Sequence, residues 1–168
     1  MKTIQLTKGQ VTIVDDVDYE FLSQWEWYAK RHRNCFRAAR KLPGENGKQK
    51  TLYMYTAIAK RMGIDTKRID HKDQNPLNNQ RSNLRAATVS QNGHNRGAPS
   101  NSKTGVKGVS LHTTSGKYVA YISLHGKRYH LGSFNTVAEA KQVVVAKRAK
   151  LIGEFATATL KRNNCNKT

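Results

Sequence analysis

The stretch that most constrains the fold of this chain is residues 95–104, which read NRGAPSNSKT. It combines Gly, Pro, Ser and Asn and holds no apolar residue larger than Ala, a composition typical of connecting segments. In a chain of 168 residues it leaves two parts, neither long enough for a large hydrophobic core. We therefore predict an α+β protein with two small domains, a linker and a polar tail, at residues 1–96, 105–157, 97–104 and 158–168 respectively.

The first domain is predicted to begin with a β-hairpin. Residues 2–14 alternate and are rich in β-branched types around a Lys8-Gly9 turn. Residues 15–18 are suited to cap a short helix, and residues 51–60 read as a strand that passes into a helix. Three aromatic residues are expected in the small core of this domain, although stacking on nucleic-acid bases is an alternative role for them: Trp25, Trp27 and Tyr28.

The second domain is predicted to be a small three-stranded antiparallel sheet packed on one helix. Its strands are expected at residues 106–111, 118–124 and 128–131, with turn residues between them. Thr136 and Glu139 form the pattern of a capping box at the start of a helix, and Gly153 ends that helix. Three strands and one helix make a minimal module of this size.

The charge of the chain points to an anionic partner. Thirty Lys and Arg against eleven Asp and Glu give a formal net charge of +19, and no carboxylate occurs between Gln74 and Ala138. Such a field attracts a polyphosphate at long range and releases counterions on contact. Nucleic-acid binding is therefore the favoured interpretation, with a merely solvated basic surface, as in a ribosomal protein, as the alternative.

The cysteines and the apolar pattern restrict the compartment. Cys35 and Cys165 have no second Cys or His at ligand spacing, so we expect no structural zinc and no disulfide. No stretch approaches the ~20 apolar residues of a membrane span, so no membrane partner is expected. The opening MKTIQLTKGQ lacks the apolar core of a signal peptide, which favours the cytoplasm.

The residues suited to catalysis lie in the segment 69–95, which reads IDHKDQNPLNNQRSNLRAATVSQNGHN. Asp70 and Asn92 offer two oxygen ligands for a divalent ion such as Mg²⁺, and His71 has a pKa suited to a general base. A partner such as Asn83 can fix the tautomer of that base. Singly, these residues read as helix caps or surface residues, but their joint spacing favours phosphodiester hydrolysis. Adjacent strand residues point to opposite faces, so a strand end or a twist must bring Asp70 and His71 to one phosphate.

This segment resembles the HNH homing-endonuclease family, in its phage and intron-encoded branch. The resemblance covers roughly residues 3–96, and it implies a ββα-metal fold, two antiparallel strands and a helix around one Mg²⁺ or Mn²⁺. It implies that Asp70 and Asn92 bind the metal, that His71 is the general base, and that Asn83 holds the loop and orients the base. The matching residues are Asp70-His71-Lys72-Asp73, Asn78-Asn79, Asn83-Leu84-Arg85 and Asn92.

The segment departs from the family at two positions. Asn92 stands where a His is more frequent, which bears on metal preference, and Tyr55 stands where relatives often have a His. His94 follows two residues later and is an alternative ligand, although the nine-residue spacing from Asn83 favours Asn92.

A second pattern is formed by residues 104–140, TGVKGVSLHTTSGKYVAYISLHGKRYHLGSFNTVAEA, and by the closing Gly153-Glu154-Phe155-Ala156. Through these segments the second domain resembles the AP2/ERF DNA-binding domain over about residues 104–157. Ala120, Ile122 and Leu124 share the face of the middle strand that would meet the helix, which leaves the other face for DNA. Departures such as Ser110 and His130 mean that no sequence preference carries over. The expected DNA-binding residues are Lys107, His112, Lys117, Tyr121, Ser123 and Arg128.

Together these features predict a site-directed endonuclease acting on double-stranded DNA, with a cutting domain and a positioning domain. A monomer is plausible, and a single site in a monomer would nick one strand. Cleavage is expected to rise with pH through the titration range of His71. The alternatives are a non-catalytic DNA-binding regulator with a decayed nuclease domain, and an RNA-binding protein.

Overall fold

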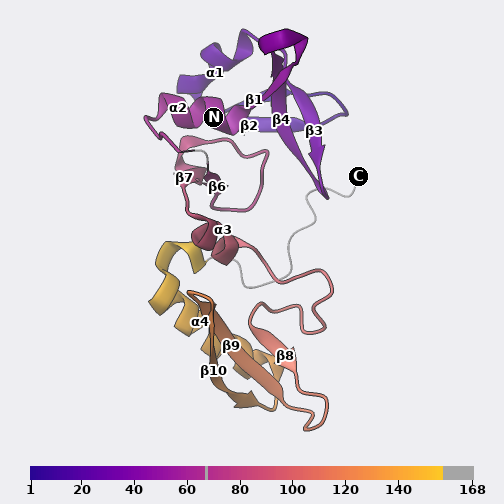
Figure 1. Ribbon diagram of the computed structural model, residues 1–168, viewed down its shortest axis with the longest axis vertical. Coiled ribbons are helices and arrows are strands. Elements are labelled where there is room, and N and C mark those ends of the chain that lie inside the picture. The colour runs from indigo at the N-terminus through magenta and orange to yellow at the C-terminus, as the bar shows by residue number, and fades with distance from the viewer. Residues whose placement is uncertain (67, 157–168) are drawn as a thin grey trace. The chain divides into compact units, whose positions relative to one another are not determined.

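The computed structural model describes residues 1–66 and 68–156 (Figure 1). The chain forms two compact units, the first from Met1 to Ala87 and the second beginning at Thr88. In the described residues both units combine short helices with small antiparallel sheets, in agreement with the α+β class. None of the described helices has the length and apolar composition that a membrane span requires.

The first unit begins with the predicted hairpin. Strand β1 (Lys2–Gln5) pairs antiparallel with β2 (Val11–Val14). Lys8 and Gly9 both adopt positive φ angles, 60° and 64°, at the turn between them. The turn therefore lies where the Lys8-Gly9 pattern predicts it.

A three-stranded sheet and two helices follow. The helix predicted after residues 15–18 is α1 (Asp16–Ser23), and the strand and helix predicted at residues 51–60 are β5 (Lys50–Tyr53) and α2 (Met54–Arg61). Strand β5 pairs with β4 (Cys35–Leu42), which also pairs with β3 (Tyr28–His32), and a short 3₁₀ helix, η1 (Glu45–Gly47), lies between β4 and β5. The core includes Leu22, Met54 and Ile58, which are fully buried, and Trp27, as predicted, while Trp25 packs against it partly exposed.

A second pair of strands carries the Asp-His segment. Strand β6 (Ile69–His71) pairs antiparallel with β7 (Leu84–Ala86), which follows the 3₁₀ helix η2 (Arg81–Asn83). The loop between them is held to β2, because the Ile13 amide donates to the Leu77 carbonyl at 2.9 Å and the Asn79 amide donates to the Ile13 carbonyl at 2.8 Å. The N-terminal hairpin thus fixes the loop that follows His71.

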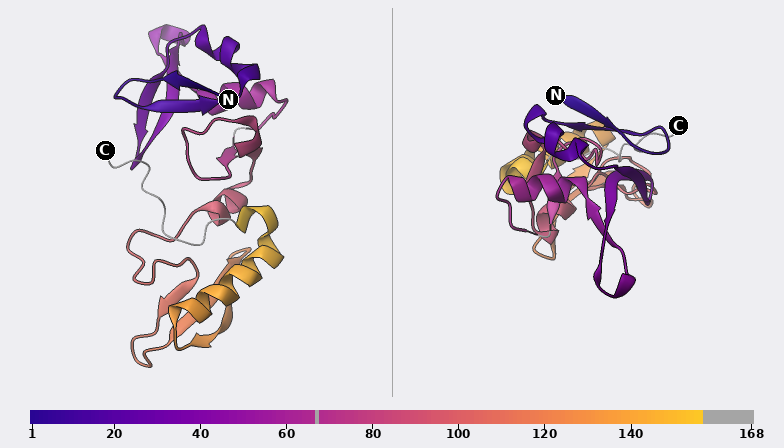
Figure 2. Two further views of the ribbon diagram at one scale, coloured as in Figure 1. Left: turned by 180° about the vertical axis from the view of Figure 1, so that it is seen from behind. Right: turned by 90° about the horizontal axis from the view of Figure 1, so that it is seen from above.

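The second unit contains the predicted sheet and helix. Its strands lie in the order β10 (Lys127–Phe134), β9 (Tyr118–Leu124), β8 (Val109–Leu111), and α4 (Val137–Ile152) runs along one face of the sheet (Figures 1 and 2). Thr136 caps α4 by accepting from the Glu139 amide, and Gly153 follows the helix with a φ of 61°, at the start of η3 (Gly153–Ala156). The core between sheet and helix includes Val109, Ala120, Ala140 and Val144.

Gly108 marks a close backbone approach in this unit. Its carbonyl accepts from the Tyr121 amide at 2.8 Å, and its φ is 84°. A Cβ atom at this position would lie 2.5 Å from the Tyr121 carbonyl oxygen. Only glycine satisfies both the dihedral angle and the contact.

The boundary between the units lies earlier in the chain than predicted. Helix α3 (Val89–Asn95) falls in the second unit, and so do residues 97–104, where a linker is predicted from composition. Ala98 is fully buried, and the Thr104 hydroxyl donates to the Val109 carbonyl at 2.8 Å. Small and polar residues pack here because their partners are backbone groups rather than apolar side chains. The predicted tail at residues 158–168, with Cys165, lies outside the described residues, and Cys35 is a half-buried thiol.

Candidate functional site

His71 lies at the end of β6 and is joined to a chain of buried hydrogen bonds. Its Nε2 lies 3.2 Å from Oδ1 of Asn79, and Nδ2 of Asn79 donates to the Thr12 hydroxyl at 2.8 Å. That hydroxyl lies 2.7 Å from the Leu77 carbonyl oxygen. Thr12 and Asn79 are fully buried, so β2 and the loop hold the imidazole from within the core.

This chain of contacts fixes the tautomer of His71. A carbonyl oxygen can only accept, so the Thr12 hydroxyl donates to Leu77 and accepts from the Asn79 amide nitrogen. The other atom of that amide is then the acceptor Oδ1, which requires a proton on Nε2 of His71. The neutral ring therefore carries its lone pair at Nδ1.

Burial acts on the charge state of His71. Desolvation lowers the pKa of the imidazole below its ordinary value, while the hydrogen bond to Asn79 and the nearby carboxylate of Asp73 act in the opposite direction. The ring also meets Tyr55 edge to face, with centroids 5.5 Å apart. Tyr55, the second departure from the family pattern, thus forms part of the wall around the imidazole.

Asn83 holds the loop between β6 and β7. Its Oδ1 accepts from the Asp73 amide at 3.0 Å, and its Nδ2 donates to the Asp73 carboxylate at 2.9 Å and to the Asn78 carbonyl at 2.7 Å. These bonds agree with the predicted loop-holding role. The orienting bond to His71 comes instead from Asn79, which the resemblance quotes as part of the motif but assigns no role.

Asp70 is buried and paired with Arg85. The two residues lie opposite each other on β6 and β7, and Arg85 donates to Oδ2 of Asp70 from Nε at 3.1 Å and from a terminal nitrogen at 2.9 Å. Both side chains are less than a tenth exposed. Such charge-assisted bonds fix the orientation of a carboxylate.

The donor set predicted for a metal consists of oxygen atoms, which suits Mg²⁺ or Mn²⁺. Asp70 lies in the first unit, whereas Asn92 lies half-buried on α3 in the second, so their joint coordination stays a prediction. Among the described residues no three His, Cys, Asp or Glu side chains come together as a metal-binding group. A site made of one carboxylate and one amide does not require such a cluster.

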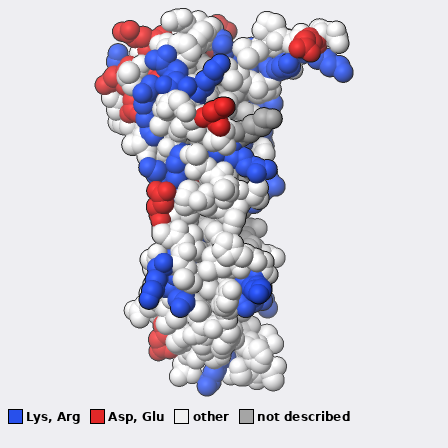
Figure 3. Space-filling model, turned by 60° about the vertical axis from the view of Figure 1, so that its left-hand side comes forward, with Lys and Arg blue, Asp and Glu red and all other residues white. Residues whose placement is uncertain are grey.

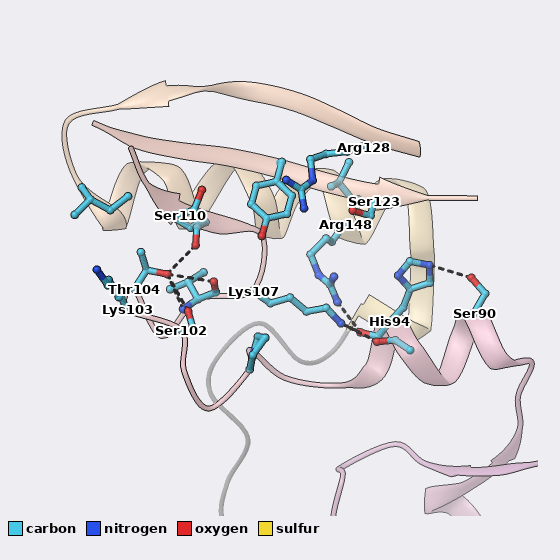
Figure 4. A pocket seen from close by; sticks show the side chains of 18 of the residues that line it. Ser90, His94, Ser102, Lys103, Thr104, Lys107, Ser110, Ser123, Arg128 and Arg148 are labelled. Atoms are coloured by element: carbon cyan, nitrogen blue, oxygen red, sulfur yellow. Dashed lines mark hydrogen bonds between the residues drawn. The ribbon is translucent and has the colours of Figure 1, made fainter. Parts of the chain in front are cut away.

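Two basic side chains hold the C-terminal end of α3. The ammonium group of Lys107 donates to the carbonyl oxygens of Gly93, His94 and Arg96 at 2.7, 3.1 and 2.7 Å. Arg148 of α4 donates to the His94 carbonyl at 2.8 Å, and Figure 4 shows both side chains running toward this helix end. Lys107, predicted to face DNA, therefore has a structural task that its sequence position does not reveal.

The other residues predicted to contact DNA lie at one end and along one face of the sheet. His112 and Lys117 are exposed at the β8–β9 turn, where Nδ1 of His112 lies 2.9 Å from the Ser115 hydroxyl. Tyr121 and Ser123 alternate with buried residues on β9, and the guanidinium of Arg128 lies 4.3 Å from the centre of the Tyr121 ring. His94, the alternative metal ligand, has Nε2 3.3 Å from the Ser90 hydroxyl of its own helix.

The carboxylates are divided unequally along the chain. Residues 88–156 hold ten Lys or Arg and two Glu, and the other nine carboxylates lie in residues 1–73. Figure 3 shows Lys and Arg side chains spread over one face of the molecule, while carboxylates gather on the part that belongs to the first unit. Residues 1–87 hold seventeen Lys or Arg, so each part carries a formal excess of eight positive charges, and the second unit differs in having few carboxylates to repel a polyanion.

The residues that sequence reasoning missed are Thr12, Asn79 and Arg85. Asn79 and Arg85 belong to the quoted motif, so the motif identifies their positions. It does not identify the residues to which they bind. Thr12 is 67 residues from Asn79 in the chain, and nothing in the pattern of β2 distinguishes it from an ordinary buried strand residue. Only the pairing of β2 with the loop identifies its role.

Comparison with known proteins gives a family match and two relatives. A protein-family profile described as "HNH endonuclease" matches residues 62–94. An uncharacterized HNH endonuclease of Acanthamoeba polyphaga mimivirus is 30% identical over 150 residues, which are 89% of this chain and 74% of the relative. Protein 3.8 of Escherichia phage T7 is 32% identical over 88 residues, 52% of this chain and 72% of that protein. No solved structure matches the chain.

Proposed function

Since this chain belongs to the HNH endonuclease family and is a DNA endonuclease, we propose that it uses His71 as the general base for phosphodiester hydrolysis. In this proposal Asp70 and Asn92 bind one divalent ion, Mg²⁺ or Mn²⁺, and Asn83 holds the loop between the two strands. In the same proposal, β6, β7 and α3 are the two strands and the helix of the ββα-metal arrangement, because they contain these residues.

The observation that carries the proposal is the fixed tautomer of His71. With Nε2 protonated and bonded to Asn79, the imidazole presents Nδ1 as the atom that accepts the proton of the attacking water. The lowered pKa keeps the ring neutral, and so able to accept a proton, at neutral pH. A base that needs no reorientation before the reaction loses little free energy to ordering.

The metal ligands are supported by their chemistry and by their surroundings. A bound divalent ion would supply positive charge to stabilise the phosphorane-like transition state and the leaving oxygen. Asp70 is suited to hold such an ion because Arg85 fixes its carboxylate on β6. The amide oxygen of Asn92 completes the hard donor set.

We propose that the second unit binds duplex DNA and directs the cut, as the resemblance to the AP2/ERF domain implies. Its ten Lys and Arg against two Glu in residues 88–156, together with the exposed positions of Lys117 and Arg128, support this role. Both relatives come from viruses, which supports action inside an infected cell, as a homing-type element. A monomer with one site would nick one strand.

Plasmid cleavage tests the catalytic assignment. Supercoiled plasmid is incubated with Mg²⁺ or Mn²⁺, and conversion to nicked or linear DNA is followed with time. His71→Ala should lower the rate by about 10²–10⁴-fold, the usual contribution of a general base, and EDTA should stop the reaction.

The matched control is His32→Ala, which removes an exposed His of the first unit and should cut like the wild type. Cleavage that survives His71→Ala would remove that residue from the mechanism. A wild-type protein that binds plasmid with either metal present yet never cuts would contradict the proposal and favour a regulator.

A further inference from the structure

The second unit contains a pocket of about 670 Å³, and four of the residues predicted to contact DNA line it: Lys107, Tyr121, Ser123 and Arg128 (Figure 4). Its walls are α3, the segment that follows α3, and the face of the sheet that carries Tyr121. Among the described residues that line it there is no carboxylate, whereas six are Ser or Thr. Its basic side chains are His94, Lys103, Lys107, Arg128 and Arg148.

The positive groups of the pocket are crowded and partly desolvated. Arg148 is 3% exposed, and burial lowers the pKa of its guanidinium. The Lys107 ammonium group and the Arg148 guanidinium both donate to the His94 carbonyl, at 3.1 and 2.8 Å, so two positive groups meet at one atom. An anion in the pocket would offset this repulsion and accept hydrogen bonds from the surrounding hydroxyl groups.

Tyr121 and Arg128 add a stacked pair of flat groups to this polar lining. The guanidinium of Arg128 lies 4.3 Å from the centre of the Tyr121 ring, and both residues line the pocket. Aromatic rings and guanidinium planes are the groups on which proteins stack unpaired bases. A phosphate site and a stacking surface in one cavity suit a nucleoside phosphate.

The shape of the pocket distinguishes a single nucleotide from a duplex. A sheet that enters the major groove must present an open face, but here α3 and the segment after it form a second wall opposite Tyr121 and Ser123. A cavity of this volume is typical of sites for small molecules rather than for a stacked base pair. The face predicted to read a groove is therefore concave where Tyr121 lies.

We propose that this pocket binds one unpaired nucleotide of the DNA substrate, with its phosphate near Arg128 and Arg148 and its base against Tyr121. The proposal rests on the proposed function in that the ligand belongs to the DNA that the enzyme cuts. It implies a preference for DNA in which a nucleotide is already extrahelical, because extruding a base from an intact duplex costs a few kcal/mol.

Fluorescence anisotropy of labelled DNA tests the proposal without cleavage. The full chain carrying His71→Ala is titrated with a duplex that holds a single-nucleotide bulge, with the same duplex fully paired, and with the single strand. The bulged duplex should bind about tenfold more tightly than the paired one, as expected when one stacked base is gained. Deoxynucleoside monophosphate should compete with the bulged duplex if the pocket takes the nucleotide itself.

Two variants locate the preference in the pocket. Tyr121→Ala removes the stacking surface, and Ser123→Trp fills the mouth of the pocket from an exposed strand position without removing a core side chain. Both should bind bulged and paired duplexes equally. Tyr129→Ala, which removes a 48% exposed tyrosine that does not line the pocket, should keep the preference.

Equal affinity of the His71→Ala protein for bulged and paired duplexes would overturn the proposal, and so would a preference that survives both Tyr121→Ala and Ser123→Trp. These outcomes are distinct from failure of the proposed function, because binding is measured without cutting. A wild-type enzyme that cuts plasmid and lacks the bulge preference would leave the nuclease assignment intact and refute the pocket.

Discussion

His71 owes its orientation to two side chains that lie far from it in the chain. Asn79 holds Nε2, and Thr12 holds Asn79, in a network in which each member is buried or half-buried. Buried networks of this kind act as a unit, since the loss of one member leaves the others without a partner for a polar atom. The protonation of a single imidazole nitrogen therefore depends on the whole chain of contacts.

Replacing Asn79 should impair catalysis more than it impairs DNA binding. Asn79→Ala removes the acceptor for Nε2–H, so the ring can rotate or change tautomer, and kcat should fall by about 10–100-fold, the usual cost of losing such a partner. KM for plasmid and the salt dependence of binding should change little. Steady-state kinetics beside circular dichroism check this.

Asn75→Ala is the matched control for that experiment. Asn75 is exposed on the same loop, and its side chain accepts from the Leu77 amide rather than contacting His71. An equal loss of kcat in both variants would mean that the loop as a whole, and not the bond to His71, determines the rate.

The sequence alone was sufficient to propose His71 as the base but not to identify the side chains that hold it. Asp70, His71 and Asn83 are recognisable because their spacing is local and their chemistry is limited to a few residue types. Asn79 looked like one of several amides in NPLNNQ, and its role depends on a strand that precedes it by more than sixty residues. Long-range pairing of this kind leaves no local pattern.

Among the elements, α3 illustrates how a short helix is held at both ends. A capping box between Thr88 and Gln91 satisfies its first amides, and Lys107 and Arg148 bind its last carbonyls. A seven-residue helix has little stability by itself, so these contacts determine whether it forms. Because Asn92 lies on α3, the proposed metal ligand depends on side chains of the unit that is proposed to bind DNA.

Lys107 should behave as a clamp for α3 rather than as a phosphate contact. Lys107→Met keeps the apolar stem and removes the ammonium group, so amide hydrogen exchange in residues 89–95 should accelerate. A residue that neutralises a phosphate lowers the salt slope of DNA binding by about one unit when it is removed. For Lys107→Met that slope should not change.

Lys117→Met provides the comparison, since Lys117 is exposed at the β8–β9 turn. It should lower the salt slope and leave hydrogen exchange in α3 unaltered. If Lys107→Met lowers the salt slope of DNA binding and leaves hydrogen exchange in α3 unaltered, Lys107 contacts a phosphate and does not hold α3.

The regular elements of the second unit were predictable and the position of α3 was not. Thr136 and Gly153 mark the ends of α4, and the alternation of residues 118–124 matches β9 because one face of that strand is buried. Residues 97–104 have the composition of a linker, yet Ala98 is fully buried, because small residues permit close backbone packing that hydrophobicity patterns do not register.

At the scale of the whole molecule, the two units use charge differently. The first unit contains most of the carboxylates, and some of them form internal ion pairs. The side chain of Asp18 is 1% exposed, and it accepts hydrogen bonds from Arg61 at the end of α2 and from Arg81 in η2. Residues 88–156 contain two carboxylates, Glu139 and Glu154, although their formal excess of eight positive charges equals that of residues 1–87. Acid should therefore destabilise the first unit more than the second.

Asp18 determines the expected pH dependence. Its hydrogen bonds with Arg81 and then Arg61 outweigh burial and lower the pKa of the carboxyl group below its ordinary value. A depressed folded-state pKa gives stability that is fully present above the unfolded value near 3.8 and is lost as the pH falls through the folded value. Asp18→Asn should lower the free energy of unfolding at pH 7 by about 3 kcal/mol, the low end for a broken buried pair, since both Arg partners are about a third exposed.

Tryptophan fluorescence measures this unit selectively, because both Trp residues, Trp25 and Trp27, lie in it. The difference between wild type and Asp18→Asn in denaturant titrations should shrink below pH 4. Asp16→Asn, which alters an exposed carboxylate bound to the N-terminal amine, should stay close to the wild type. A difference that is the same at pH 3 and pH 7 would exclude Asp18 as the source.

The contact between Thr12 and Asn79 also bears on how small such an enzyme can be. The residues with recognised chemistry lie between Asp70 and Asn92, and the family profile matches only residues 62–94. A fragment cut to those limits would retain the base and its neighbours but lose the strand that determines which nitrogen of the base is protonated. Under the proposed mechanism the smallest competent cutting unit extends back to the N-terminal hairpin, and a graft of the motif onto another scaffold would need to supply a hydroxyl in the place of Thr12.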